Sequence, residues 1–122
     1  MSVTKPFILL IEDDAASAEA LTMILRDWGA EVAHAQDASA LPQALGARAS
    51  TLHCIITDFH LGDGPDGVAL AQDVRALAPR SRVLVLSGSF HGRAMIAAQA
   101  AGFHFMHKPA RADDILAWLE KR

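Results

Sequence analysis

The stretch Phe7-Ile8-Leu9-Leu10-Ile11-Glu12-Asp13-Asp14 decides the fold class of this chain of 122 residues. An uninterrupted apolar run ends abruptly at three acidic residues. Short unbroken runs of this kind are typical of a strand that is buried on both faces, as in a parallel sheet covered by helices. The stretch therefore predicts a central strand over 7–11, and the acids mark its carboxyl end.

Strand-like and helix-like patterns alternate along the rest of the chain. Further strands are predicted at Ala30–Ala35, Leu52–Phe59, Arg82–Ser87 and Phe103–His107. Apolar residues at helical spacing predict a helix in each interval. These helices run through Ala18, Leu21, Leu25 and Trp28 up to Gly29, through Val68, Ala71, Val74 and Leu77, over 92–101 up to Gly102, and through Ile115, Leu116, Trp118 and Leu119. The turn Gly88-Ser89 follows the fourth strand.

The helix between the second and third strands has two candidate starts. Ser39 can cap it, which places Pro42 at the third helical position, where no intrahelical amide bond is lost. If the helix begins at Ala38 instead, Pro42 must kink it. The residues Gly62–Gly67 have the composition of a loop, with Asp63 and Asp66 as turn residues.

Five strand–helix repeats predict a parallel sheet with helices on both faces and right-handed crossovers. A closed eight-fold barrel needs about 250 residues, so the length excludes it. The predicted fold class is α/β, a single doubly wound five-stranded parallel sheet of flavodoxin-like order 2-1-3-4-5 with five helices. Residues 1–122 are expected to form one domain.

Composition narrows the class of function. The net charge is −3, whereas a nucleic-acid-binding face is basic. Cys54 is the single cysteine, which excludes a disulfide framework and predicts a small buried core residue. The longest apolar run is too short to span a bilayer, and residues 1–6 are too short for a signal peptide. We therefore expect a soluble protein in the reducing cytoplasm, without contact to nucleic acid or membrane.

Polar and charged residues gather where the predicted strands end, which is where open α/β sheets bind ligands. They are Glu12 and Asp13, then Asp58, Ser87 and Lys108. Two carboxylates about 4 Å apart repel by ~4 kcal/mol at an effective dielectric constant near 20, so three of them either raise one another's pKa or recruit a cation. Carboxylate oxygens suit Mg²⁺. A hydroxyl, an ammonium and a cation can together hold a phosphoryl group, with Asp58 as its nucleophile.

These residues, at these spacings in a five-fold repeat, resemble the receiver domain of two-component response regulators over about residues 6–121. The resemblance implies that Asp58 is the phosphoacceptor, which takes a phosphoryl group from a phosphohistidine of a histidine kinase or histidine phosphotransfer protein. It implies that Mg²⁺ is bound by Asp13 and Asp58, by Glu12 through water, and by the backbone carbonyl of His60. It also implies that the domain is a switch with self-directed, slow dephosphorylation, and not an enzyme.

The resemblance assigns further roles on the same rim and beside it. Ser87 matches the hydroxyl that turns toward the phosphoryl group, and Lys108 matches the lysine that contacts it. Pro109 matches a proline that follows a cis peptide bond, a rare feature elsewhere. Phe105 falls at the position of the switch aromatic, where Tyr is usual. The surface over residues 92–121 is expected to carry the output and can also form a homodimer.

The chain also departs from the commoner pattern of the family. The interval from Gly102 to Lys108 is one residue shorter than in many members. The loop from Asp58 to Gly67 resembles that of receivers attached to hybrid sensor kinases, in which case these residues are an excised domain.

Two other function classes fit the sequence less well. A phosphatase with an aspartyl-phosphate intermediate wants a second Asp two residues after the nucleophile, and His60 stands there. A flavodoxin-like cofactor binder or an inert interaction domain shares the architecture. A cofactor binder wants a Gly-rich loop after the first strand, and the residues there are acidic.

Overall fold

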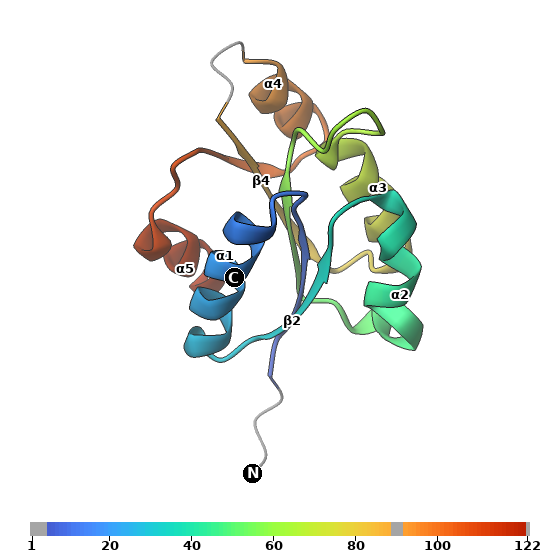
Figure 1. Ribbon diagram of the computed structural model, residues 1–122, viewed down its shortest axis with the longest axis vertical. Coiled ribbons are helices and arrows are strands. Elements are labelled where there is room, and N and C mark those ends of the chain that lie inside the picture. The colour runs from blue at the N-terminus through green and yellow to red at the C-terminus, as the bar shows by residue number, and fades with distance from the viewer. Residues whose placement is uncertain (1–4, 89–91, 122) are drawn as a thin grey trace.

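In the computed structural model, which describes residues 5–88 and 92–121, five parallel strands pair in the order β2-β1-β3-β4-β5 (Figure 1). They are β1 (Phe7–Ile11), β2 (Glu31–Ala35), β3 (Cys54–Asp58), β4 (Arg82–Ser87) and β5 (His104–His107). The predicted order and fold class are thus confirmed. β1 and β4 have the predicted bounds, whereas the other strands are shorter at their ends than predicted.

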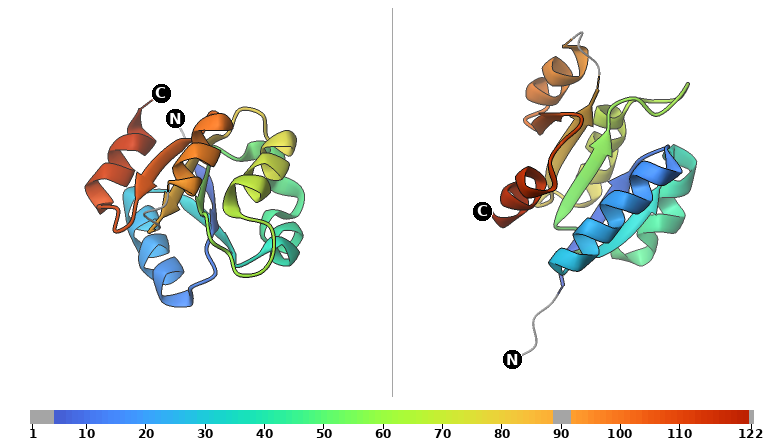
Figure 2. Two further views of the ribbon diagram at one scale, coloured as in Figure 1. Left: turned by 90° about the horizontal axis from the view of Figure 1, so that it is seen from above. Right: turned by 60° about the vertical axis from the view of Figure 1, so that its left-hand side comes forward.

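Helices follow the strands and cover both faces of the sheet (Figure 2). They are α1 (Ala15–Trp28), α2 (Leu41–Leu45), α3 (Gly67–Leu77), α4 (Arg93–Ala100) and α5 (Ala112–Glu120). Two 3₁₀ turns, η1 (Ala38–Ala40) and η2 (Gly46–Thr51), flank α2. α1 and α5 pack on one face of the sheet, and α2, α3 and α4 on the other.

The central strand β1 explains why its sequence is an unbroken apolar run. Ile8 and Leu10 belong to the core beneath α1 and α5, whereas Phe7, Leu9 and Ile11 belong to the core beneath α2, α3 and α4. All five side chains are at most 3% exposed. Because successive residues of a strand point to opposite faces, a strand covered on both sides needs apolar residues at every position.

The start of the second helical segment differs from both predicted alternatives. The Asp37 carboxylate caps η1 by accepting a hydrogen bond from the Ala40 N–H (3.1 Å). Ser39 is not the cap and instead donates its hydroxyl to Asp37. Pro42 lies in the first turn of α2, where no intrahelical N–H is needed, so it causes no kink. Asp37, whose backbone is extended, thus supplies the cap, one position before Ala38, the earlier of the two predicted starts.

Other local predictions can be compared with the structure. Asp14 caps α1 by accepting from the Ser17 N–H (2.8 Å). Asp66, predicted as a turn residue, caps α3 by accepting from the Ala69 N–H (2.8 Å). Leu77, predicted on the buried face of that helix, is its last residue and is 61% exposed. Cys54 is buried as predicted.

The two tryptophans of the predicted helices differ in burial. Trp118 is buried, and Trp28 is half-buried with its Nε1–H donated to Glu120. Ser89 of the predicted turn lies outside the described residues. Across residues 5–88 and 92–121, none of the helices combines the length and the apolar run that a bilayer span requires.

Candidate functional site

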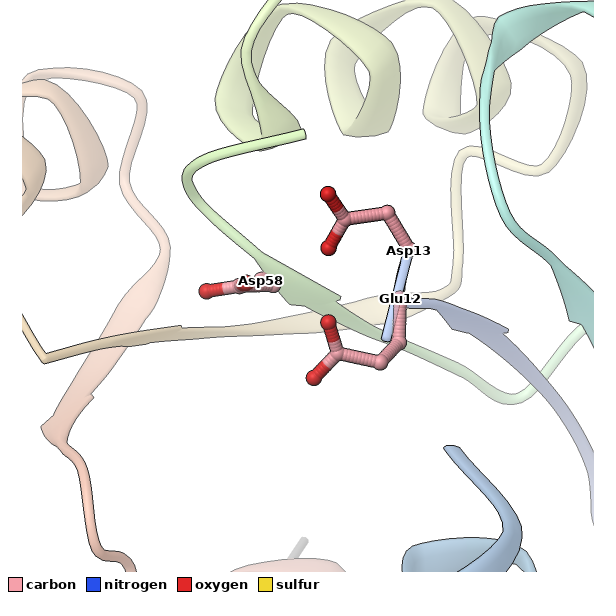
Figure 3. A group of neighbouring side chains, drawn as sticks. All are labelled: Glu12, Asp13 and Asp58. Carbon is pink, nitrogen blue, oxygen red and sulfur yellow. The ribbon is translucent and has the colours of Figure 1, made fainter. Parts of the chain in front are cut away.

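Three acidic side chains meet at the carboxyl ends of the two central strands. Glu12 and Asp13 follow β1, and Asp58 ends β3, which pairs directly with β1. One carboxylate oxygen from each residue lies within 4.8 Å of the others. Figure 3 shows the three carboxyl groups around a common space. Glu12 is buried, Asp58 half-buried and Asp13 exposed, so the cluster opens to solvent on the side of Asp13.

Lys108, which follows β5, brings an ammonium group into the same cluster. Its Nζ lies 3.0 Å from Oε1 of Glu12 and 3.3 Å from Oδ2 of Asp58. Its backbone N–H donates to the carbonyl of Ser87, which continues the pairing of β5 with β4. The peptide bond between Lys108 and Pro109 is cis. The lysine therefore spans the ends of β4 and β3 to reach the acid beside β1.

Burial and charge shift the protonation of this pair. Burial raises the pKa of Glu12, the Asp58 charge adds to that, and the hydrogen bond from Lys108 only partly opposes it. Burial by itself would lower the pKa of Lys108, but the hydrogen bond to Glu12 and the charges of Asp58 and Glu12 outweigh it and raise this pKa above its usual range. The lysine is thus held charged, and it neutralises only part of the three carboxylates.

The donor set fits a hard divalent cation. Three carboxylates and one ammonium, when all are ionised, leave two negative charges uncompensated in a space less than 5 Å across. Oxygen ligands of this kind suit Mg²⁺ or Ca²⁺. Glu12, Asp13 and Asp58 can therefore bind a divalent metal ion. His60, whose carbonyl is the further predicted ligand, lies two residues after Asp58 with its ring exposed and edge-on to Phe59.

Ser87 and Phe105 lie on the strands next to the acids. Ser87 is fully buried at the end of β4, one residue beyond Leu86, which pairs with Asp58. Phe105 is half-buried on β5, and its ring meets that of His107 edge-on at 4.9 Å. Ser87 is therefore a neighbour of the acid cluster, whereas Phe105 lies further down the sheet, packed against the core beneath α2, α3 and α4.

Three residues that the sequence did not single out bind the backbone beside the acid cluster. The Thr57 hydroxyl donates to the Asp58 carbonyl (2.8 Å), and the Gly67 N–H donates to the Phe59 carbonyl (2.8 Å). On the other side, His34 Nε2 lies 2.7 Å from the Glu12 carbonyl oxygen. A glycine directly after the capping Asp66 was a usable signal for Gly67. Thr57 and His34 gave none, because their partners are backbone atoms.

Comparison with known proteins agrees with this arrangement. Residues 8–120 match the family model described as the response regulator receiver domain. The transcriptional regulatory protein FixJ of Bradyrhizobium diazoefficiens is 30% identical over 120 residues, covering 96% of this chain and 56% of that protein. ZraR of Escherichia coli is 30% identical over 116 residues, covering 93% of this chain and 25% of that protein. The chain thus spans about half or less of the length of these relatives.

A solved structure with the same fold contains a cation. A response regulator protein from Burkholderia pseudomallei, solved with a phosphorylated aspartic acid, a calcium ion and citrate, superposes with a TM-score of 0.82 at 29% identity. The match covers 96% of this chain and 68% of that one. Relatives and neighbour thus fit one class of signalling domain, in which an aspartate accepts a phosphoryl group. This chain belongs to the response regulator receiver domain family of two-component signalling.

Proposed function

We propose that Asp58 accepts a phosphoryl group from a phosphohistidine of a sensor kinase or a histidine phosphotransfer protein, in a reaction that depends on Mg²⁺. One Asp58 oxygen attacks the phosphorus, the bond from phosphorus to the imidazole nitrogen breaks, and the imidazole leaves. The observation that carries the proposal is the convergence of Lys108 and two further carboxylates on Asp58. The convergence supports the proposal because phosphoryl transfer of this kind needs a nucleophile, a cation and a positive side chain around one point.

The side chains of the cluster have separate tasks in this proposal. Asp13, Asp58, the His60 carbonyl and, through water, Glu12 would hold Mg²⁺, which would offset the charge on the phosphoryl oxygens when bound. Lys108, already within 3.3 Å of Asp58, would pair with one phosphoryl oxygen. The buried hydroxyl of Ser87 would donate to another. Because the ammonium is held charged at rest, it is ready to accept a new anionic partner without taking up a proton.

Phosphorylation would work as a charge switch. It adds about −1.5 to −2 charge units at Asp58. Drawing Ser87 toward the phosphoryl group would change the space available to the Phe105 ring, which carries no hydroxyl and so would respond by burial alone. The shift would bias a two-state equilibrium of the surface over residues 92–121, through which the domain would signal or form a homodimer.

The wider setting is part of the same proposal. Residues 1–122 would act as one domain in the cytoplasm, where the kinase phosphohistidine is formed. The domain would be a phosphoacceptor switch, and slow hydrolysis of its own phosphoaspartate would reset it. The loop from Asp58 to Gly67 supports an origin among receivers of hybrid sensor kinases.

Labelling with a small phosphodonor tests the proposal. Incubation with acetyl phosphate and Mg²⁺ should add one phosphoryl group, which mass spectrometry detects, and a chelator should prevent it. Asp58→Asn should abolish the label, whereas Asp63→Asn, at an exposed loop acid, should keep it. Lys108→Ala should fold and yet show little change in the amide spectra of residues 92–121 after labelling. Undiminished labelling of Asp58→Asn would refute the assignment.

A further inference from the structure

His34 binds the backbone between the two acids that follow β1. Its Nε2 lies 2.7 Å from the Glu12 carbonyl oxygen. A carbonyl can only accept, so the ring must donate from Nε2. The backbone N–H of Glu12 donates to the Ala35 carbonyl (3.1 Å). The last two residues of β2 therefore hold both backbone polar groups of Glu12.

This contact bears directly on Asp13. The Glu12 carbonyl and the Asp13 nitrogen share one planar peptide unit, so fixing the carbonyl fixes the direction in which Asp13 leaves the strand. The Glu12 carboxylate is held separately, by Lys108 Nζ at 3.0 Å and by the Asp14 N–H at 3.4 Å. Within the described part of the chain, the Asp13 carboxylate has no hydrogen bond or ion pair to another side chain. Its position thus depends on the peptide that His34 binds.

The restraint on Asp13 opposes electrostatic repulsion within the acid cluster. The three carboxylates repel one another, and Asp13, as the exposed member, is the one free to swing away. A metal site with a displaced ligand binds its ion less tightly, and partners that orient ligands affect affinity for this reason. The His34 ring can reach the Glu12 carbonyl because β2 pairs with β1, in the register Ile11 to Ala35.

We propose that His34 is a positioning residue of the cation site, which holds the Glu12–Asp13 peptide so that the Asp13 carboxylate stays beside Asp58. The inference rests on the proposed cation site. A purely structural role, stabilising the edge strand β2, is the competing explanation, and the chain offers a matched control for it. The exposed His53 makes a comparable contact at the start of β1, the strand that Glu12 follows, where its Nδ1 accepts from the Phe7 N–H (3.2 Å).

Calorimetric titration with Mg²⁺ alone, combined with thermal unfolding, separates the two roles. His34→Val keeps a good strand former without a donor, and should weaken Mg²⁺ binding about fivefold, equivalent to about 1 kcal/mol. His34→Gln, whose amide can donate from a similar position, should restore most of the affinity without a ring. His53→Val should lower the melting temperature to a similar extent and leave Mg²⁺ affinity unchanged.

Each other result has a distinct meaning. Equal affinity of His34→Val and the native protein would overturn the positioning role while leaving the cation site intact. Affinity of His34→Gln as low as that of His34→Val would also overturn it, since the hydrogen-bond donor would then not matter. Absence of Mg²⁺ binding by the native protein would overturn the cation site itself, and the inference with it.

Discussion

Gly67 lies so close to the end of β3 that no side chain fits there. A Cβ atom at this position would be 1.9 Å from the Asp58 carbonyl oxygen and 2.6 Å from the Thr57 hydroxyl. The Gly67 N–H also donates to the Phe59 carbonyl. The first residue of α3 therefore packs directly against the backbone of Asp58, and the helix sets the path of the loop that leaves Asp58.

We expect Gly67→Ala to destabilise the fold and to disturb the acid cluster. The added methyl group must push α3 away from β3, and overpacking of this kind costs about 1–3 kcal/mol. Denaturant unfolding should show this loss, and Mg²⁺ titration should show weaker binding. Gly64→Ala is the matched control, because a Cβ there meets nothing within 4 Å. Equal stability of the two variants would contradict the steric argument.

Cys54 makes the free energy of unfolding depend on pH in the alkaline range. Burial raises the pKa of its thiol to about 11 from an ordinary value of 9.0. Between these values the unfolded chain ionises its thiol and the folded chain does not, so the contribution of the thiol is present below pH 9 and is lost as the pH approaches 11. The stability difference between the native protein and Cys54→Ala should therefore fall by about 2 kcal/mol over this range. A constant difference would mean that the thiol is accessible to water.

At the scale of elements, Arg82 fastens the last helix to the sheet. It begins β4, and its Nη1 donates to the carbonyls of Trp118 (2.8 Å) and Lys121 (2.7 Å) at the end of α5. Its guanidinium also lies 4.1 Å from the centre of the Trp118 ring. Unpaired carbonyls at a helix end need such donors, so one side chain caps α5 and covers its core tryptophan.

Arg82→Lys should free the end of α5, because a lysine keeps the charge but not the planar fork of donors. We expect a loss of about 1–2 kcal/mol in unfolding free energy and faster amide hydrogen exchange at residues 118–121. Arg80→Lys, at an exposed neighbour without an ion pair in the part of the chain that the structure describes, should change neither. Unchanged exchange in Arg82→Lys would show that packing alone holds the helix.

The same elements show what the sequence could and could not predict. β1 was predicted to the residue because full burial on both faces leaves an unbroken apolar run, and β4 contains a similar buried run between Arg82 and Ser87. The cap at Asp37 and the exposure of Leu77 were not predicted, since the first depends on backbone conformation and the second on where the helix ends, which apolar spacing does not fix.

The acid cluster was predictable for a topological reason. In a parallel sheet the carboxyl ends of all strands lie at one edge, so residues that end strands meet there. The structure accordingly brings Glu12, Asp13, Asp58 and Lys108 together. Thr57 and His34 could not be predicted in the same way, because their hydrogen-bond partners are backbone carbonyls, which the pattern of side chains does not encode.

At the scale of the whole molecule, negative charge is concentrated at the carboxyl ends of the two central strands. The chain carries a net charge of −3, and three carboxylates lie within 4.8 Å at one end of the sheet. This concentration opposes folding in the absence of a cation, and a bound cation relieves it. Stability and cation binding are therefore linked, as for any ligand that binds the folded state alone.

Asp13→Asn separates the two sides of this linkage. In a chelator it should raise the melting temperature, because one of three repelling charges is removed. Mg²⁺ at ten times its dissociation constant should stabilise the native protein by about 1.4 kcal/mol, and the same concentration should stabilise the variant much less. Asp27→Asn removes the same charge at an exposed site on α1, so it should leave both quantities near their native values if the repulsion is local. A rise in melting temperature common to both variants would instead assign the effect to net charge, and the cluster would not be the place where the fold is strained.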